Sequence, residues 1–218
     1  MLKHLKDDRW YGRLGRRKLK NRDQFTREYR RILEALHNVV SIAIRCPFNE
    51  GWGQFDAKEI ANWTHEFDPA RLVDHASGWF DQGGGDFKSE HVYFKQLPKA
   101  DPDASRAWVL SEFGGYSLNL PKHAWKPKKD FGYKKYINGA SLTRGYIDLL
   151  ENQLSTWINA GLSAAIYTQT TDIETEVNGF LTYDRKTIKM DLEAIKLAHQ
   201  TLLEVNQQND KEPKNCRK

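Results

Sequence analysis

Two glutamates lie in short glycine-rich segments of similar character. Glu50 stands in Pro47-Phe-Asn-Glu-Gly-Trp-Gly-Gln-Phe55, and Glu112 stands in Ser111-Glu-Phe-Gly-Gly115. A pair of carboxyl groups can hydrolyse a glycosidic bond, because one protonates the leaving oxygen while the other attacks the sugar or activates water. The alternative is that each glutamate is a salt-bridge partner in a loop, and residue type alone does not decide between these interpretations.

Side chains that suit sugar binding accompany the two glutamates. Aromatic faces stack on sugar rings, while amides and imidazoles bind hydroxyl groups. His91 is interpreted either as a ligand for a sugar hydroxyl or as an imidazole satisfied within the protein, and Trp52 either as a stacking platform or as loop packing. The candidates taken from the residues themselves are Asn49, Trp52, His91, Tyr93, Tyr167 and Gln169.

Helical and strand patterns alternate along the chain. Apolar residues at a period of 3.6 predict helices, and short β-branched runs that are apolar on both faces predict buried strands. Helices are predicted over 23–37, 56–67, 142–159 and 190–205, and strands over 39–44, 71–76, 91–94, 107–113 and 162–169.

This alternation predicts an α/β fold with a parallel sheet covered by helices. An open doubly wound sheet and a barrel both fit the pattern, and the Gly-x-Gly-x-x-Gly signature of dinucleotide binding is absent. In either architecture reactive groups gather at the C-terminal ends of strands. Glu50 and Glu112 each follow a predicted strand, so the pattern places both glutamates where such folds carry their chemistry.

Composition excludes several classes of protein. The 218 residues carry a net charge of +5, and residues 1–31 alone hold twelve basic and four acidic residues. This basic segment has no accompanying nucleic-acid-binding signature, so no nucleic acid partner is expected. No apolar run is long enough to span a membrane, and no His, Cys or carboxylate spacing indicates a metal site. A monovalent or divalent cation near the site is compatible with the pattern but not indicated by it, and no cofactor is expected.

The two glutamate segments closely resemble those of glycoside hydrolase family 2, the group of β-galactosidases, β-glucuronidases and β-mannosidases. Ala164-Ala-Ile-Tyr-Thr-Gln-Thr-Thr171 and Val177-Asn-Gly-Phe-Leu-Thr-Tyr-Asp-Arg185 also resemble the end of that family's catalytic barrel. The resemblance runs from about Gln24 to Glu204. It implies a (β/α)8 barrel of the TIM type and hydrolysis with retention of anomeric configuration.

The resemblance also implies roles for individual residues. Glu50, after the fourth barrel strand, is expected to be the acid/base, and Glu112, after the seventh, the nucleophile. Asn49 is expected to bind the sugar 2-hydroxyl. Tyr93 matches the tyrosine that hydrogen-bonds the nucleophile, with an aromatic packed under a loop as the alternative. Trp79 is a further candidate for stacking or for loop packing, and Asn178 matches a residue near the sugar.

No segment of the sequence corresponds to barrel strands one to three. The prediction is therefore an incomplete barrel of approximately strands four to eight, with exposed strand edges that favour self-association and with weakened substrate binding. By domain, 1–22 is a basic N-terminal remnant of the preceding barrel region, 23–206 is the partial catalytic domain, and 207–218 is a polar disordered tail.

The resulting functional expectation is a retaining exo-β-glycosidase acting on a neutral β-hexoside. A neutral sugar is expected because the Asn-x-Lys of family glucuronidases is missing after Val177 and the loop around Glu174 and Glu176 is acidic. A galactoside is favoured because Asn178-Gly-Phe-Leu-Thr-Tyr-Asp-Arg185 resembles the β-galactosidase version of this segment. The alternative is a catalytically inactive remnant that binds carbohydrate or takes part in assembly. The start of the chain is not a secretory signal, so the cytoplasm is the default compartment, although an upstream segment could have carried an export signal.

Overall fold

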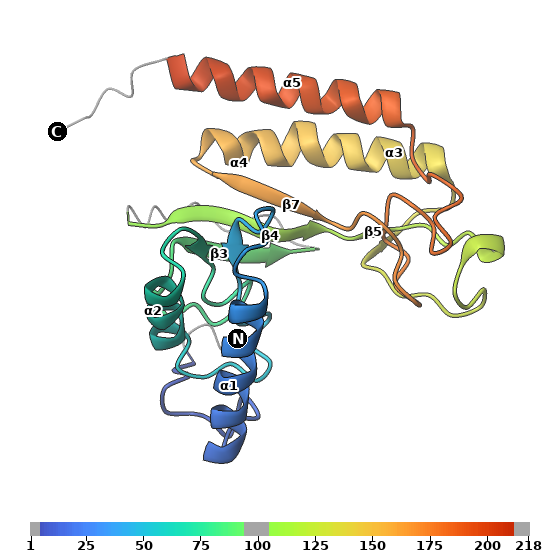
Figure 1. Cartoon of the computed structure of the whole chain (residues 1–218). Coiled ribbons are helices and arrows are strands. Elements are labelled where there is room, and N and C mark those ends of the chain that lie inside the picture. The colour runs from blue at the N-terminus through green and yellow to red at the C-terminus, as the bar shows by residue number, and fades with distance from the viewer. Residues whose placement is uncertain (1–4, 94–104, 212–218) are drawn as a thin grey trace. The chain divides into compact units, whose positions relative to one another are not determined.

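The computed structural model describes residues 5–93 and 105–211. The described chain forms two compact units, one built from 5–91 with 105–111 and the other from 92–93 with 112–211 (Figure 1). We call them unit 1 and unit 2, and each is described by itself.

Unit 1 combines two helices with short parallel strands. Strand β1 pairs with β2 in parallel register, with Ile44 opposite Leu72. The elements of unit 1 are α1 (Leu19–Ala35), β1 (Ile44–Arg45), α2 (Ala57–Phe67), β2 (Leu72–Val73), β3 (Phe87–Val92) up to His91, and β4 (Ala107–Gly114) up to Ser111.

An aromatic cluster forms the core of unit 1 beneath the Glu50 segment. Tyr29 and Leu33 of α1 are buried one helical turn apart, which is the spacing that aligns side chains on one helix face. They pack with Phe48 and Phe55, which flank the Glu50 turn on both sides. The turn is therefore anchored at each end by a buried phenylalanine.

Three charged side chains join β1, α2 and β2. The guanidinium of Arg45 donates to Asp68 Oδ2 at 3.0 Å, and Arg71 donates to the same carboxylate at 2.8 Å. Arg45 is 5 % exposed and Asp68 is 1 % exposed. Arg45, at the end of β1, is thus buried against a carboxylate.

The strand predicted over 39–44 is wrong for most of its length. Residues 40 and 41 lie in a turn, and Val40 is 96 % exposed. The amide of Val39 donates to Leu36 O and that of Ile42 to Val39 O, so local turn bonds replace sheet pairing until Ile44. Arg71 donates to the carbonyl oxygens of His37 and Val39 and holds these turns in place.

The basic N-terminal segment packs on unit 1 over its described residues. Leu5 and Leu14 are buried, and the Asp7 carboxylate accepts hydrogen bonds from Gln54 Nε2 at 2.8 Å and from the Ala57 amide at 3.1 Å. Burial raises the pKa of Asp7 above its ordinary value, against these hydrogen bonds. The segment therefore supports the turn that follows Glu50.

Unit 2 is a helical layer over short strands. Helix α5 runs beside the continuous helical stretch α3–η2–α4, and β7 lies beneath that stretch (Figure 1). The helix predicted over 142–159 is present and contains one π-helical segment. The elements are the end of β4, β5 (Tyr116–Ser117), η1 (Pro121–His123), β6 (Lys134–Lys135), α3 (Gly139–Asp148), η2 (Leu149–Leu154), α4 (Ser155–Asn159), β7 (Ala164–Thr168) and α5 (Leu192–Lys211).

The sheets over the described residues are small. Strand β4 is hydrogen-bonded to β3 and to β7, while β5 and β6 form a separate parallel pair. The barrel remains a prediction from the resemblance. Of the predicted tail, residues 207–211 continue α5, and 212–218 lie outside the described residues. None of the described helices combines the length and apolar character needed to cross a bilayer.

Candidate active site

Glu50 lies directly beyond the β1–β2 pair, where the chain continues beside residue 77. A parallel bridge joins Asn49 to Ser77, the Ser77 amide donates to Phe48 O, and the Glu50 amide donates to Ser77 O, both at 2.9 Å. Glu50 thus follows a short parallel pairing at the C-terminal side of the strand, as its sequence position predicts.

The backbone of Glu50 adopts a conformation that is unusual for a residue with a side chain. Its φ is 54°, and Gly51 follows with a φ of 75°. A β-carbon on Gly51 would overlap the ring of Phe80, so only glycine fits at that position. Left-handed backbone at a non-glycine residue is characteristic of functional sites that the surrounding structure holds in place.

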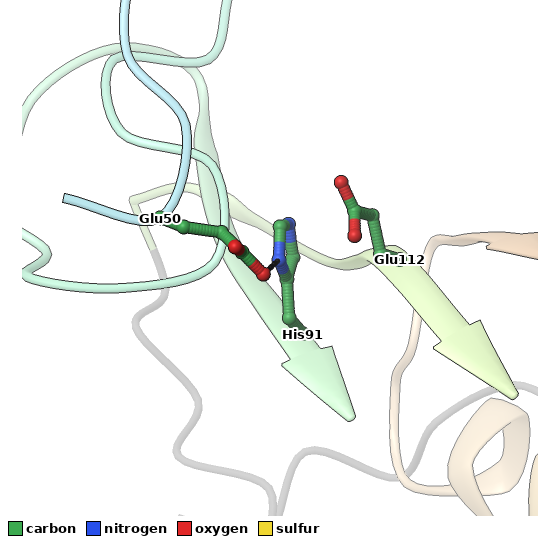
Figure 2. A group of neighbouring side chains, drawn as sticks. All are labelled: Glu50, His91 and Glu112. Carbon is green, nitrogen blue, oxygen red and sulfur yellow. Dashed lines mark hydrogen bonds and ion pairs between the residues drawn. The ribbon is translucent and has the colours of Figure 1, made fainter. Parts of the chain in front are cut away.

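The Glu50 side chain is held by His91 of β3. Oε1 of Glu50 lies 3.0 Å from His91 Nδ1, and the other ring nitrogen, Nε2, lies 3.0 Å from Ser77 Oγ. Figure 2 shows the contact between the carboxylate and the ring. The His91 side chain is 1 % exposed and that of Glu50 is 26 % exposed. This places the imidazole inside the protein with both nitrogens near protein groups, and leaves the carboxylate partly open to solvent.

The three other candidates of unit 1 are exposed. Trp52 is 80 % exposed and Trp79 is 43 % exposed, and Asn49 is also exposed. Trp52 is largely exposed and Trp79 is partly exposed, so each indole presents some of its surface to solvent. These positions suit contact with a ligand, and their roles stay predictions.

In unit 2 the Tyr93 hydroxyl donates to Glu112 Oε2. The same hydroxyl lies 3.3 Å from Thr168 Oγ1 at the end of β7. The resemblance implies this contact between Tyr93 and Glu112. Burial, followed by the hydrogen bond to Glu112, raises the pKa of Tyr93 well above its ordinary value. Tyr93 therefore stays protonated and acts as a donor that orients the Glu112 carboxylate.

A second tyrosine fixes the ring of Tyr93. Tyr133 stacks on it with ring centroids 3.7 Å apart and an angle of 6° between the planes. Gly115 has a φ of 64°, and a β-carbon there would collide with Tyr133 and press on Tyr93. The glycines that follow Glu112 thus allow two aromatic rings to approach the strand end closely.

The predicted residues on and after β7 are largely occupied within the protein. Tyr167 packs edge-on against Phe113 and Tyr146, and its hydroxyl accepts from the Tyr116 amide at 3.2 Å. Asn178 is fully buried and accepts from Gln169 Nε2 at 2.8 Å. These contacts show side chains that shape the strand end, and direct sugar contact by them stays a prediction.

Sequence reasoning missed Ser77, Ser111 and Tyr133. Ser77 Oγ and Ser111 Oγ are 2.7 Å apart, which extends the Glu50–His91 contact to β4. Ser111 stands in the quoted Glu112 segment but carries no predicted role there, and nothing in the sequence marks Ser77. Tyr133 has a weak signal, since an aromatic residue follows Gly132 within a run rich in tyrosine and lysine.

Sequence reasoning also missed a partly exposed ionic group in the Trp79 loop. Arg106 donates twice to the Asp81 carboxylate, at 2.8 Å to each oxygen, and His75 Nε2 lies 3.1 Å from it. Burial acts to raise the pKa of Asp81, but the hydrogen bonds from His75 and Arg106 outweigh it and hold that pKa well below its usual range. The group fixes the loop that presents Trp79.

Metal binding has little support within either unit. Taken alone over the described residues, neither unit gathers three His, Cys, Asp or Glu side chains with ligand atoms close enough to share one ion. The expectation of no resident metal or cofactor stays a prediction.

The comparisons with known proteins give no family for the chain. No model of a protein family matches it, and no curated protein matches it. The resemblance in the glutamate segments is therefore the only family-level argument, and it enters below as a proposal.

Proposed function

We propose that the chain carries the catalytic residues of a retaining β-glycosidase of the glycoside hydrolase family 2 type, on part of a (β/α)8 barrel. The observation that carries the proposal is the hydrogen bond from Tyr93 to Glu112 at the end of β4. A protonated phenol fixed by stacking gives Glu112 an oriented carboxylate, which is what attack on an anomeric carbon requires.

In this proposal Glu112 forms a bond to the anomeric carbon while the bond to the leaving oxygen breaks. Glu50 donates its proton to that oxygen, and it then takes a proton from the water that cleaves the glycosyl–enzyme bond. Glu50 suits this exchange because its carboxylate is partly exposed and held at one oxygen by His91. Retention requires the two carboxyl groups to act about 5–5.5 Å apart.

The proposed substrate is a neutral β-hexoside, with a galactoside favoured. Exposed Trp52 and Trp79 offer stacking faces, and exposed Asn49 offers an amide for the 2-hydroxyl. Glu174 is exposed in the loop that follows β7, and its charge disfavours an anionic sugar.

The test is turnover of aryl β-glycosides combined with azide rescue. Glu112→Gly is expected to lose activity by on the order of 10⁴-fold and to yield the α-glycosyl azide when azide replaces the missing carboxylate. Glu50→Ala is expected to yield the β-glycosyl azide, because azide then attacks the glycosyl–enzyme. Glu59→Gln, at an exposed position of α2, is the matched control and should retain full activity. Absence of turnover by the unmodified chain on every aryl β-hexoside would reject the proposal.

A further inference from the structure

Four side chains of unit 1 form a continuous hydrogen-bonded line that ends at the proposed acid/base. Ser111 Oγ lies 2.7 Å from Ser77 Oγ, Ser77 Oγ lies 3.0 Å from His91 Nε2, and His91 Nδ1 lies 3.0 Å from Glu50 Oε1. We call Ser111, Ser77 and His91 the Glu50 relay. It links β4, the residue 77 turn and β3 to one carboxylate oxygen.

Burial along this line is greatest in its middle, because Ser111 is half-buried while Ser77 and His91 are buried. Ser77 is 5 % exposed and the His91 side chain is 1 % exposed, whereas the Glu50 side chain is 26 % exposed. Buried polar groups in a network are restricted in orientation because each must keep its partners. The buried members Ser77 and His91 are therefore restricted in orientation, and the Glu50 carboxylate beside them stays accessible.

The backbone ties the same residues together. The Ser77 carbonyl oxygen accepts from the Glu50 amide at 2.9 Å, so Ser77 holds Glu50 through both backbone and side chain. Gly78 has a φ of 88°, and a β-carbon there would overlap the His91 ring. The turn after Ser77 is thus shaped to admit the imidazole.

We propose that Ser77 and Ser111 are positioning residues that fix the His91 ring. His91 in turn holds Oε1 of Glu50 and leaves Oε2 as the oxygen that exchanges a proton with the leaving group and with water. The proposal rests on the proposed glycosidase function. Protons balance because Glu50 releases one to the leaving oxygen and regains one from the attacking water, while the relay keeps its own protons throughout.

The same line resembles the Ser–His–acid triad of serine hydrolases, with Ser77 as the nucleophile. Burial decides against that reading, because a nucleophile must reach its substrate and Ser77 is 5 % exposed. Its hydroxyl is also engaged by Ser111. Ser77 accordingly acts through His91.

The first test compares leaving groups, because a positioned acid matters only when the leaving oxygen needs a proton. Ser77→Ala is expected to lower kcat/KM for phenyl β-galactoside on the order of 10²-fold, as displacement of a reacting group by about 1 Å does. For 2,4-dinitrophenyl β-galactoside, whose leaving group needs no proton, the loss should stay below about 3-fold. Ser111→Ala, one step further from Glu50, should show the same selectivity with a smaller effect, and exposed Ser41→Ala is the control.

Equal losses on both substrates would overturn the positioning role while leaving the glycosidase proposal intact. If the chain hydrolyses p-nitrophenyl acetate and only Ser77→Ala, not Ser111→Ala, loses this activity, the positioning role would be overturned in favour of a nucleophilic Ser77.

A second test needs no glycosidase activity. The ring nitrogen resonances of His91 should shift in Glu50→Gln, and this response should be lost when Ser77→Ala is added but kept when Ser41→Ala is added. A response that survives Ser77→Ala would show that Ser77 does not position the ring, whatever reaction the chain performs.

Discussion

At the scale of single residues, Glu50 holds a backbone conformation that costs about 1–2 kcal/mol for a residue with a β-carbon. Its φ is 54°. The free energy of unfolding should therefore be about 1 kcal/mol higher for Glu50→Gly than for Glu50→Ala. Both variants lose the contact with His91, and only glycine relieves the backbone strain. Urea unfolding of the two variants measures the difference. At exposed Glu59 of α2 the order should reverse, because glycine is the poorer helix former.

Tyr93 supplies a prediction about activity and its pH dependence. Tyr93→Phe keeps the stack on Tyr133 and removes the donor to Glu112, so kcat should fall about 10²-fold, the scale seen when one oriented donor is lost. The pKa of Tyr93 is raised, so the hydroxyl is protonated at every pH below its ordinary value of about 10. The ratio of wild-type to variant rates should therefore be constant between about pH 5 and 9. A ratio that changes tenfold across this range, or an equal loss in Tyr183→Phe, would contradict the role.

At the scale of elements, the Arg45–Asp68–Arg71 group holds α2 to β1 and β2. Burial opposes the charge on Asp68, but hydrogen bonds from Arg45 and Arg71 outweigh it and lower its pKa. Asp68→Asn leaves Arg45 buried without a compensating charge, and the free energy of unfolding near pH 7 should fall by about 3 kcal/mol.

The same group gives a pH dependence with a definite sign. A carboxylate whose pKa is lowered on folding stabilises the protein above its unfolded pKa of about 3.9, and this stabilisation is lost as the pH falls toward the folded value. The difference in free energy of unfolding between wild type and Asp68→Asn should thus be smaller at about pH 2.5 than at about pH 7. Urea unfolding of both proteins at about pH 7 and about pH 2.5 measures this difference. A difference that is larger in acid would contradict the lowered pKa of Asp68.

Periodicity predicts those elements whose own pattern is strong. Helix α2, the helical stretch 139–159 and strands β4 and β7 lie close to their predicted positions. The run 39–44 fails because local turn bonds and Arg71 compete with pairing, which β-branched residues alone do not reveal. Ser77 and Ser111 could not be found, because a serine becomes part of a site only through contacts between distant segments.

At the scale of the whole molecule, the end of the described three-stranded sheet is a candidate surface for self-association. Over the described residues β7 pairs with β4, and Ile166 on β7 is 59 % exposed. Unpaired strand edges with apolar side chains favour association between chains. Sedimentation velocity should show concentration-dependent association that Ile166→Lys reduces. Ile137→Lys, at a 90 % exposed position just before α3, should leave it unchanged. A chain that stays monomeric at all concentrations would contradict this expectation.

The central claim is that Glu112 forms a covalent bond to the sugar. Incubation with 2,4-dinitrophenyl 2-deoxy-2-fluoro-β-galactoside traps such a bond, because the fluorine slows its hydrolysis more than its formation. Mass spectrometry of the intact chain and of its peptides is the direct measurement. The account predicts one fluorogalactosyl group on the peptide that contains Glu112, present in Glu59→Gln and absent in Glu112→Gln. A label on any other residue, or no label on a chain that hydrolyses aryl galactosides, would contradict it.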